Sequence, residues 1–173
     1  METNTQTLSC DDLSAQLGRL LQIRNWRITT AESCTGGGVA AAITAIPGSS
    51  RWFEYGLVTY ANQAKQHLLG VDSKSLAADG AVSEAVVHQM INGVLALSGA
   101  ELAVAVSGIA GPDGGSAEKP VGTVWFAWGT ASGERKACCY HFDGDRRAIQ
   151  QQAVISALTG ALELLEATDK KTE

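Results

Sequence analysis

Residues 30–38 (TAESCTGGG) constrain the fold of this chain more than any other stretch, because two kinds of local pattern meet there. The β-branched segment 27–30 before them predicts a strand, and the alanine-rich segment 35–45 predicts a helix. Glycines in a helix interior cost about 1 kcal/mol each relative to alanine, so three in succession are better explained by the close approach of a ligand or another backbone. The stretch therefore predicts a strand-to-helix turn that exposes Ser33 beside outward-pointing N–H groups.

Helices and strands are expected to alternate along the rest of the chain. Leucines spaced at i, i+4, i+7 and i+8 predict an amphipathic helix over 11–24, and the apolar run 102–106 predicts a strand covered on both faces. Segments 121–129 and 136–142 predict a hairpin. A strand is also expected at 52–60, and helices at 63–69 (capped by Asn62), 73–78, 83–97 (capped by Ser83) and 143–167. This order predicts an α/β fold, a three-layer α/β/α sandwich with a mixed parallel and antiparallel sheet in a single domain.

The length of 173 residues suffices for one well-packed domain, expected over 10–167, with a disordered tail at 1–9 and a frayed tail at 168–173. A formal net charge of -5 and the absence of a basic run argue against a nucleic-acid partner. No stretch of about 18 apolar residues predicts a membrane span, and the N-terminus lacks the pattern of a signal peptide. We expect a cytoplasmic protein that forms a homo-oligomer, a dimer or larger.

The cysteines Cys10, Cys34, Cys138 and Cys139 show neither a C-x-x-C pair nor a histidine spacing typical of zinc sites. Cys138 and Cys139 are adjacent, so they would point to opposite faces of a strand rather than bridge each other. We expect four reduced thiols, no metal and no cofactor. Cys34 lies at the predicted helix start, where a thiol pKa can be lowered.

Three loops are expected to meet at the carboxyl ends of the strands, where α/β sheets bind ligands. They are the Ser33 turn, the loop 107–115 and the turn 143–147. Together they supply glycines, the hydroxyls of Ser33 and Ser107, and the guanidinium groups of Arg146 and Arg147, a mixture that suits a phosphate-bearing small molecule. The chain has no standard phosphate-binding fingerprint, so spacing alone leaves phosphate binding undecided.

Each candidate catalytic residue has two interpretations on sequence alone. Ser33 is either a helix cap or a nucleophile. No G-x-S-x-G elbow is present and the three histidines do not suit a triad, so a nucleophilic Ser33 would need another base. Lys65 could serve if burial lowered its pKa from about 10.4 towards 7–8, and otherwise is a solvated helix lysine. Tyr60 either shares that pocket or ends a strand, and Glu32 either contacts a base or ligand or offsets a helix terminus.

Several segments, in a fixed order, resemble the CinA C-terminal domain family. They are TAESCTGG at 30–37, VTYAN at 58–62 followed by Lys65, SGIAGPDGG at 107–115, PVGTV at 120–124 and GDR at 144–146. The resemblance covers about residues 10–165. Longer relatives carry an N-terminal domain that resembles molybdopterin-binding proteins, and no counterpart of that domain is found in this sequence.

The resemblance implies a metal-free serine–lysine amidase that converts nicotinamide mononucleotide (NMN) to nicotinic acid mononucleotide and ammonia, in pyridine-nucleotide salvage. Ser33 would then be the nucleophile and Lys65 its base, acting directly or through Tyr60. Ser107 stands where some relatives have threonine, and Arg146 or Arg147 would bind the phosphate. The residues expected to contact substrate are Glu32, Cys34, Thr35, Gly36, Ser107, Gly108, Arg146 and Arg147.

Two alternatives remain open at this stage. One is a non-catalytic nucleotide-binding or regulatory module, because some domains of this family belong to multidomain proteins linked to competence and DNA damage. The other is an amidase for a different small amide. DNA binding is disfavoured by the acidic balance of the chain.

Overall fold

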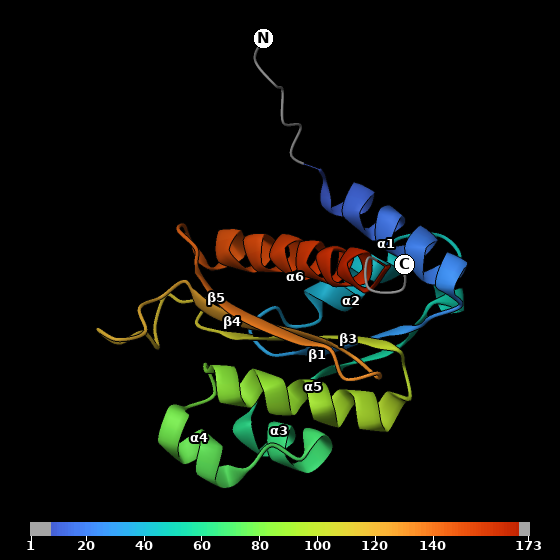
Figure 1. The fold of residues 1–173 in the computed structure, drawn as a ribbon. Coiled ribbons are helices and arrows are strands. Elements are labelled where there is room, and N and C mark those ends of the chain that lie inside the picture. The colour runs from blue at the N-terminus through green and yellow to red at the C-terminus, as the bar shows by residue number, and fades with distance from the viewer. Residues whose placement is uncertain (1–7, 170–173) are drawn as a thin grey trace.

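A computed structural model describes residues 8–169 of the chain (Figure 1). In this part of the chain a mixed sheet has the strand order β2-β1-β3-β4-β5. The strands are β1 (Ile28–Glu32), β2 (Phe53–Val58), β3 (Leu102–Gly108), β4 (Thr123–Thr130) and β5 (Arg135–His141). Strand β1 pairs in parallel with β2 and β3, whereas the β3–β4 and β4–β5 pairs are antiparallel. The predicted α/β fold with a mixed sheet in a single domain is confirmed.

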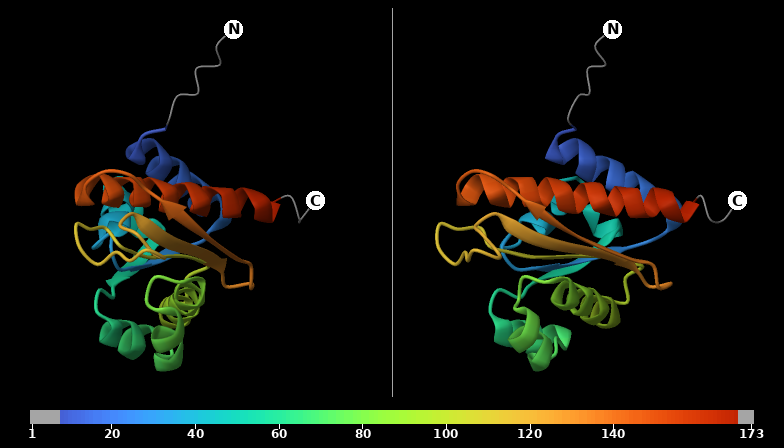
Figure 2. Two further views of the ribbon diagram at one scale, coloured as in Figure 1. Left: turned by 90° about the vertical axis from the view of Figure 1, so that its left-hand side faces the viewer. Right: turned by 60° about the vertical axis from the view of Figure 1, so that its left-hand side comes forward.

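Helices cover both faces of the sheet (Figure 1 and, from two further sides, Figure 2). Helices α1, α2 and α6 form one layer, and α3, α4 and α5 form the other. The helices are α1 (Cys10–Arg24), α2 (Gly38–Thr44), the short 3₁₀ helix η1 (Ser49–Arg51), α3 (Asn62–Leu69), α4 (Ser73–Asp79), α5 (Glu84–Ser98) and α6 (Arg146–Asp169). No helix among residues 8–169 combines the length and apolarity needed to cross a membrane.

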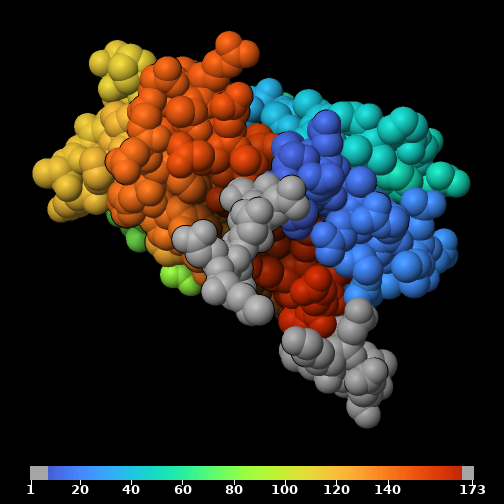
Figure 3. Space-filling model, turned by 90° about the horizontal axis from the view of Figure 1, so that it is seen from above, coloured from blue at the N-terminus to red at the C-terminus, as the bar shows by residue number. Residues whose placement is uncertain are grey.

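Each layer buries its own apolar cluster against the sheet. On the α1/α2/α6 face, Phe126 stacks on Trp128, with ring centroids 5.6 Å apart, and the Trp128 indole donates to the carbonyl of Ala157 in α6 at 2.8 Å. Figure 3 shows α1 beside α6 on this face, and the Arg24 guanidinium donates to the Leu165 carbonyl at 3.0 Å. On the other face, α5 packs fully buried residues such as Met90 against β1 and β3. The sheet is therefore covered by an apolar cluster on each face.

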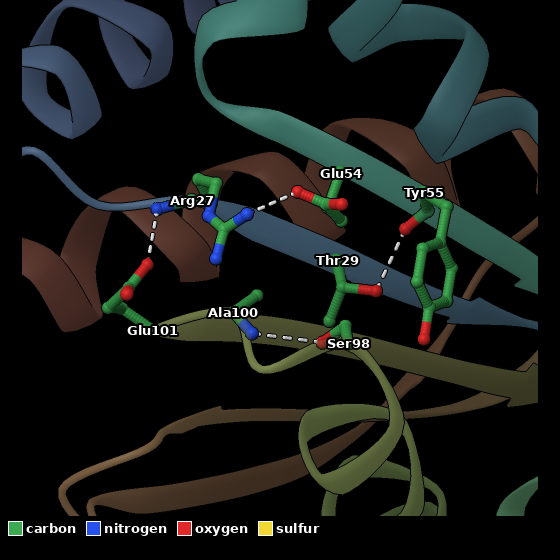
Figure 4. Close-up of polar contacts among 7 residues, drawn as sticks. All are labelled: Arg27, Thr29, Glu54, Tyr55, Ser98, Ala100 and Glu101. Carbon is green, nitrogen blue, oxygen red and sulfur yellow. Dashed lines mark hydrogen bonds and ion pairs between the residues drawn. The ribbon is translucent and has the colours of Figure 1, made fainter.

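Polar contacts fix the start of β1 between its two neighbouring strands (Figure 4). The Arg27 N–H donates to the Glu101 carboxylate at 2.6 Å, and the Arg27 guanidinium pairs with Glu54 at 2.5 Å. The Thr29 hydroxyl donates to the Tyr55 carbonyl at 2.8 Å, where the register of β2 shifts against β1. These contacts set the position from which β1 delivers Ser33 to its turn.

Several helix starts differ from the prediction, and α6, for example, begins at Arg146 rather than at 143. Helix α2 begins at Gly38 rather than near Thr35, because Gly36 and Gly37 take positive φ values of 61° and 98° that do not belong to a right-handed helix. Neither Ser33 nor Thr35 caps it. Asn62 is the first residue of α3 and Ala61 is its N-cap, so the predicted Asn62 cap is wrong. Ser83 caps α5 as predicted.

The ends of the domain extend slightly beyond the predicted bounds. The Ser9 hydroxyl accepts from the Asp12 N–H, and the Asp12 carboxylate accepts from the Ser9 N–H, so Ser9 forms a capping box with α1. Helix α6 continues through Thr168 to Asp169. The remainder of the predicted tails, 1–7 and 170–173, lies outside the described residues.

Candidate active site

Ser33 lies one residue beyond the carboxyl end of β1. Its N–H donates to the Val106 carbonyl of β3 at 2.9 Å, and its carbonyl accepts from the Gly36 N–H at 3.0 Å. The first bond fixes the residue to the sheet and the second closes the turn behind it. With 8% of its surface exposed, Ser33 is nearly enclosed and reached by solvent only at its edge.

Lys65 reaches Ser33 directly. Its Nζ lies 3.1 Å from the Ser33 Oγ and donates to the carbonyls of Thr59 and Tyr60 at 2.8 and 3.2 Å. The side chain is 1% exposed, although it belongs to a short helix on the outside of the sheet. The interpretation of Lys65 as a solvated helix lysine is therefore wrong.

Burial lowers the pKa of Lys65 from its ordinary value, because the charged ammonium loses its hydration. A neutral lysine amine has two N–H donors and one lone pair. When the neutral amine donates to the Thr59 and Tyr60 carbonyls, its lone pair is left for the third neighbour, the Ser33 hydroxyl. This arrangement allows Lys65 to remove the Ser33 proton.

Glu32 contacts the protein itself where substrate contact was predicted. Its buried carboxylate, 1% exposed, accepts from the Thr35 hydroxyl at 2.6 Å. It also accepts from the N–H groups of Gly37, Val39 and Ala40 at 3.1, 3.0 and 2.8 Å. These N–H groups belong to the start of α2. The Glu32 carboxylate therefore binds the donors that the sequence suggested for the anionic group of a ligand.

Glu32→Gln is expected to lower the free energy of unfolding by about 2–3 kcal/mol, because an amide replaces a buried carboxylate and turns its NH₂ towards N–H donors. Urea denaturation measures the change. Glu54→Gln is the matched control, since the exposed Arg27–Glu54 pair should contribute less than about 1 kcal/mol. Equal losses in both variants would contradict the anchoring role of Glu32.

Backbone donors near the serine are fewer than the sequence suggested. The Gly36 N–H is already bonded to the Ser33 carbonyl. Among residues 8–169 the Thr35 N–H has no acceptor, and it follows Ser33 by two positions. Of the two residues Thr35 and Gly36, both predicted to contact substrate, Thr35 retains a free N–H donor among residues 8–169 and Gly36 does not.

Tyr60 and Arg146 form a bridge at the edge of the site. The Arg146 guanidinium donates to the Tyr60 hydroxyl and to the Gly111 carbonyl, both at 2.8 Å. The Tyr60 side chain is 56% exposed, and among the described residues its hydroxyl bonds to neither Ser33 nor Lys65. Arg146 thus ties the end of β2 to the glycine-rich loop, and the contact between Lys65 and Ser33 needs no relay through Tyr60.

Arg147 faces a different place from Arg146. It lines a cavity of about 490 Å³ between α2 and α6, together with Cys10, Thr35, Gly38, Ala42, Gln150, Gln151, Val154 and Ile155. Neither Ser33 nor Lys65 lines this cavity. The two neighbouring arginines, which the sequence could not distinguish, therefore lie in different surroundings.

The other candidate residues have structural partners. The Ser107 hydroxyl is buried and donates to the Ala81 carbonyl at 2.8 Å. At Gly108, a Cβ would lie 2.9 Å from the Thr123 carbonyl oxygen, so close packing against β4 accounts for the glycine. Burial raises the pKa of Cys34 to about 12, which is opposite to the lowering considered for a thiol at a helix start. No group of metal-binding side chains comes together in the described part of the chain.

Three contributors to the site were absent from the sequence prediction. They are the carbonyls of Thr59 and Gly111, which bind Lys65 and Arg146, and the Gln150 side chain, which donates to the Cys34 carbonyl at 2.8 Å. A backbone carbonyl has no residue-specific signal. Gln150 falls within a predicted helix, and nothing in its spacing indicates a contact 116 positions away.

Known proteins resemble this chain over most of its length. The sequence profile of the CinA C-terminal domain matches residues 10–165. The chain is 56% identical over 155 residues to the nicotinamide-nucleotide amidohydrolase PncC of Pseudomonas putida, covering 88% of this chain and 94% of that protein. It is 57% identical over 149 residues to PncC of Escherichia coli strain K12, covering 84% and 88%.

A crystal structure supports the same relationship. The competence damage-inducible protein A (ComA) from Klebsiella pneumoniae superposes with a TM-score of 0.86 at 44% identity, covering 92% of this chain and 96% of that one. Its fold is the α/β sandwich described above. Sequence profile, relatives and fold agree over nearly the whole chain, and the protein belongs to the CinA C-terminal domain family.

Proposed function

We propose that this protein is a nicotinamide-nucleotide amidase that hydrolyses the carboxamide of NMN to a carboxylate and ammonia by a serine–lysine mechanism. The single observation that carries the proposal is the 3.1 Å contact between the Ser33 Oγ and the buried Lys65 Nζ. The similarity to two nicotinamide-nucleotide amidohydrolases supplies the substrate class. A place in pyridine-nucleotide salvage follows from that reaction.

The reaction begins when neutral Lys65 takes the Ser33 proton while Oγ attacks the carboxamide carbon. A C–O bond forms, and the carbonyl electrons move onto oxygen. The tetrahedral intermediate collapses with cleavage of the C–N bond, and the proton held by Lys65 passes to the leaving nitrogen, which departs as ammonia. Water, deprotonated in turn by Lys65, then cleaves the Ser33 ester and restores the free enzyme.

The oxyanion needs a donor that points to the position of the developing charge. The Thr35 N–H, which has no acceptor among residues 8–169, is one candidate, and one good donor contributes about 3–4 kcal/mol to the transition state. Glu32 contributes indirectly to the stabilisation of the oxyanion. By binding the Thr35 hydroxyl and the first N–H groups of α2, its carboxylate holds the turn in one conformation.

Arg146 is the better candidate for the substrate phosphate, because it lies beside Tyr60, whose carbonyl binds Lys65. We expect Arg146→Ala to raise KM for NMN about 10- to 100-fold, the value of one or two charged hydrogen bonds. Arg147→Ala should change KM by less than about threefold, since Arg147 lines the cavity without Ser33 or Lys65.

Steady-state kinetics with NMN and with nicotinamide riboside, which lacks the phosphate, test this assignment. Loss of a phosphate contact affects NMN alone. If Arg146→Ala impairs both substrates equally, the side chain acts through Tyr60 and Gly111 instead. A larger KM effect in Arg147→Ala would reverse the assignment.

The proposed activity itself is tested by ammonia release from NMN, nicotinamide, NAD and glutamine. We expect release from NMN well above that from free nicotinamide. Release from another amide in preference to NMN would identify a related amidase. Calorimetric binding of NMN without ammonia would indicate the non-catalytic nucleotide-binding module. The expected homo-oligomer is tested separately by sedimentation equilibrium.

A further inference from the structure

We propose that Gly93 in α5 is a positioning residue for Lys65, because the missing side chain lets the backbone at the end of α3 lie directly against α5. Among residues 8–169, no hydrogen bond joins Gly93 to Ser33 or to Lys65. Gly93 acts by fixing the helix that carries the lysine. The kinetic part of this inference rests on the proposed amidase function.

The contact at Gly93 leaves no room for a methyl group. An ideal Cβ there would lie 2.0 Å from the carbonyl oxygen of Leu69, 2.6 Å from its carbonyl carbon and 2.7 Å from its Cα. All three atoms belong to the backbone, so no side-chain rotation can relieve the overlap. Bringing the oxygen to 3.0 Å, the lower limit for real Cβ contacts, requires α3 and α5 to separate by about 1 Å.

This contact is linked to Lys65 through the last turn of α3. Leu69 is four residues after Lys65, and the Lys65 carbonyl accepts from the Val71 N–H at 3.2 Å. Leu69 and Val71 are buried in the same apolar cluster as Met90 of α5. Figure 1 places α3 against α5 on the outer side of the sheet. A displacement at Leu69 is therefore transmitted to the lysine backbone instead of being absorbed by a flexible loop.

Lys65 tolerates little movement, because Nζ has three partners that belong to other segments. They are the Ser33 Oγ and the carbonyls of Thr59 and Tyr60, at 3.1, 2.8 and 3.2 Å. A shift of about 1 Å takes at least one of these distances out of hydrogen-bond range. Misplacement of a catalytic group by that amount can cost about 10²-fold in rate.

The pH dependence of the rate reports on the surroundings of Nζ. The Cys34 thiol acts electrostatically on Lys65, but burial raises its pKa to about 12 and keeps it uncharged at lower pH. Several other ionisable groups near the turn and in α5 have partners of their own. Examples are Glu32 with the start of α2, Arg146 with Tyr60, and Glu84 with His88, whereas His67 lies on α3 itself. Desolvation therefore dominates, and any opening that admits water raises the pKa of Lys65 towards its ordinary value.

The experiment measures ammonia release from NMN by Gly93→Ala between pH 6 and 10, together with the melting temperature. We expect kcat to fall about 10- to 100-fold at neutral pH and the rise of the rate with pH to move to higher pH. The matched control is Gly160→Ala in α6, where a Cβ would lie 2.2 Å from the Trp128 ring, remote from Lys65. This control should lower the melting temperature and leave the pH profile in place.

A second pair of variants decides the question if Gly93→Ala does not fold. Gly70 and Gly99 end α3 and α5 with φ values of 66° and 64°, and an added Cβ meets nothing within 4 Å at either position. Alanine therefore strains both turns equally. Gly70→Ala disturbs the turn that presents Leu69 and should lower kcat about two- to fivefold with the same pH shift, whereas Gly99→Ala should do neither.

The outcomes separate this inference from the proposed function. If wild type releases ammonia and Gly93→Ala keeps the wild-type pH profile and kcat, the positioning role is overturned while the amidase stands. The same holds if Gly93→Ala is insoluble and Gly70→Ala behaves as Gly99→Ala does. Absence of ammonia release by wild type instead overturns the proposed function, and the positioning role is then decided by the titration of Lys65 followed by NMR in Gly93→Ala and wild type.

Discussion

Ser33→Ala is expected to lower kcat for ammonia release from NMN by at least about 10⁴-fold, because the acyl-enzyme cannot form without the hydroxyl. The fold should survive, since the Ser33 side chain has Lys65 as its hydrogen-bond partner while the turn is fixed by backbone bonds to Val106 and Gly36. An ammonia assay and a melting curve measure the two quantities. Calorimetry should show that NMN still binds.

Ser107→Ala is the matched control for this experiment. Ser107 is also a buried serine at the end of a strand, but its hydroxyl donates to the Ala81 carbonyl. We expect a loss of stability of about 1 kcal/mol and a kcat within about tenfold of wild type. Near-wild-type activity in Ser33→Ala would remove Ser33 as the nucleophile. A loss in Ser107→Ala as large as that in Ser33→Ala would mean that the Ser107 hydroxyl takes part in the chemistry.

Lys65→Met is expected to lower kcat about 10³-fold, the usual contribution of a general base. The unbranched side chain fills most of the same buried space without an amine. Lys65→Arg provides the matched control, because a guanidinium keeps a positive charge and cannot be deprotonated in a protein. Both variants should release ammonia about 10³-fold more slowly than wild type. Substantial activity in Lys65→Arg would show that Lys65 supplies charge instead of accepting a proton.

The pH profile of the wild-type enzyme tests the same role. Only neutral Lys65 can accept the Ser33 proton, so the rate should rise as pH increases through the pKa of Lys65. Burial lowers that pKa, which places the rise below the ordinary lysine value of 10.5. A rate that falls with increasing pH over this range would contradict the mechanism. The residual rate of Lys65→Met should lack the rise.

Particular residues show how far prediction from sequence extended. The pattern of residues 102–106 identified a buried strand, and the predicted helix ends at 69 and 97 lie within one residue of the ends of α3 and α5. The predicted start of α2 was too early. The sequence does not show that Gly36 and Gly37 adopt positive φ values, and the alanines that follow do not mark where the helix begins. For Glu32, either a substrate contact or a charge near a helix end fitted the sequence. Only the coordinates show four close donors around its carboxylate.

The sequence by itself determined the order of helices and strands and the family to which the chain belongs. Both depend on local periodicity and on motifs that are continuous along the chain. Tertiary structure decided which side chains meet. Lys65 is 32 positions from Ser33, and its lowered pKa depends on the burial of its side chain in the fold. Burial and distance between remote segments are properties of the packed fold, so only the tertiary structure decides that the buried amine of Lys65 lies within reach of Ser33 in the TAESCTGGG turn.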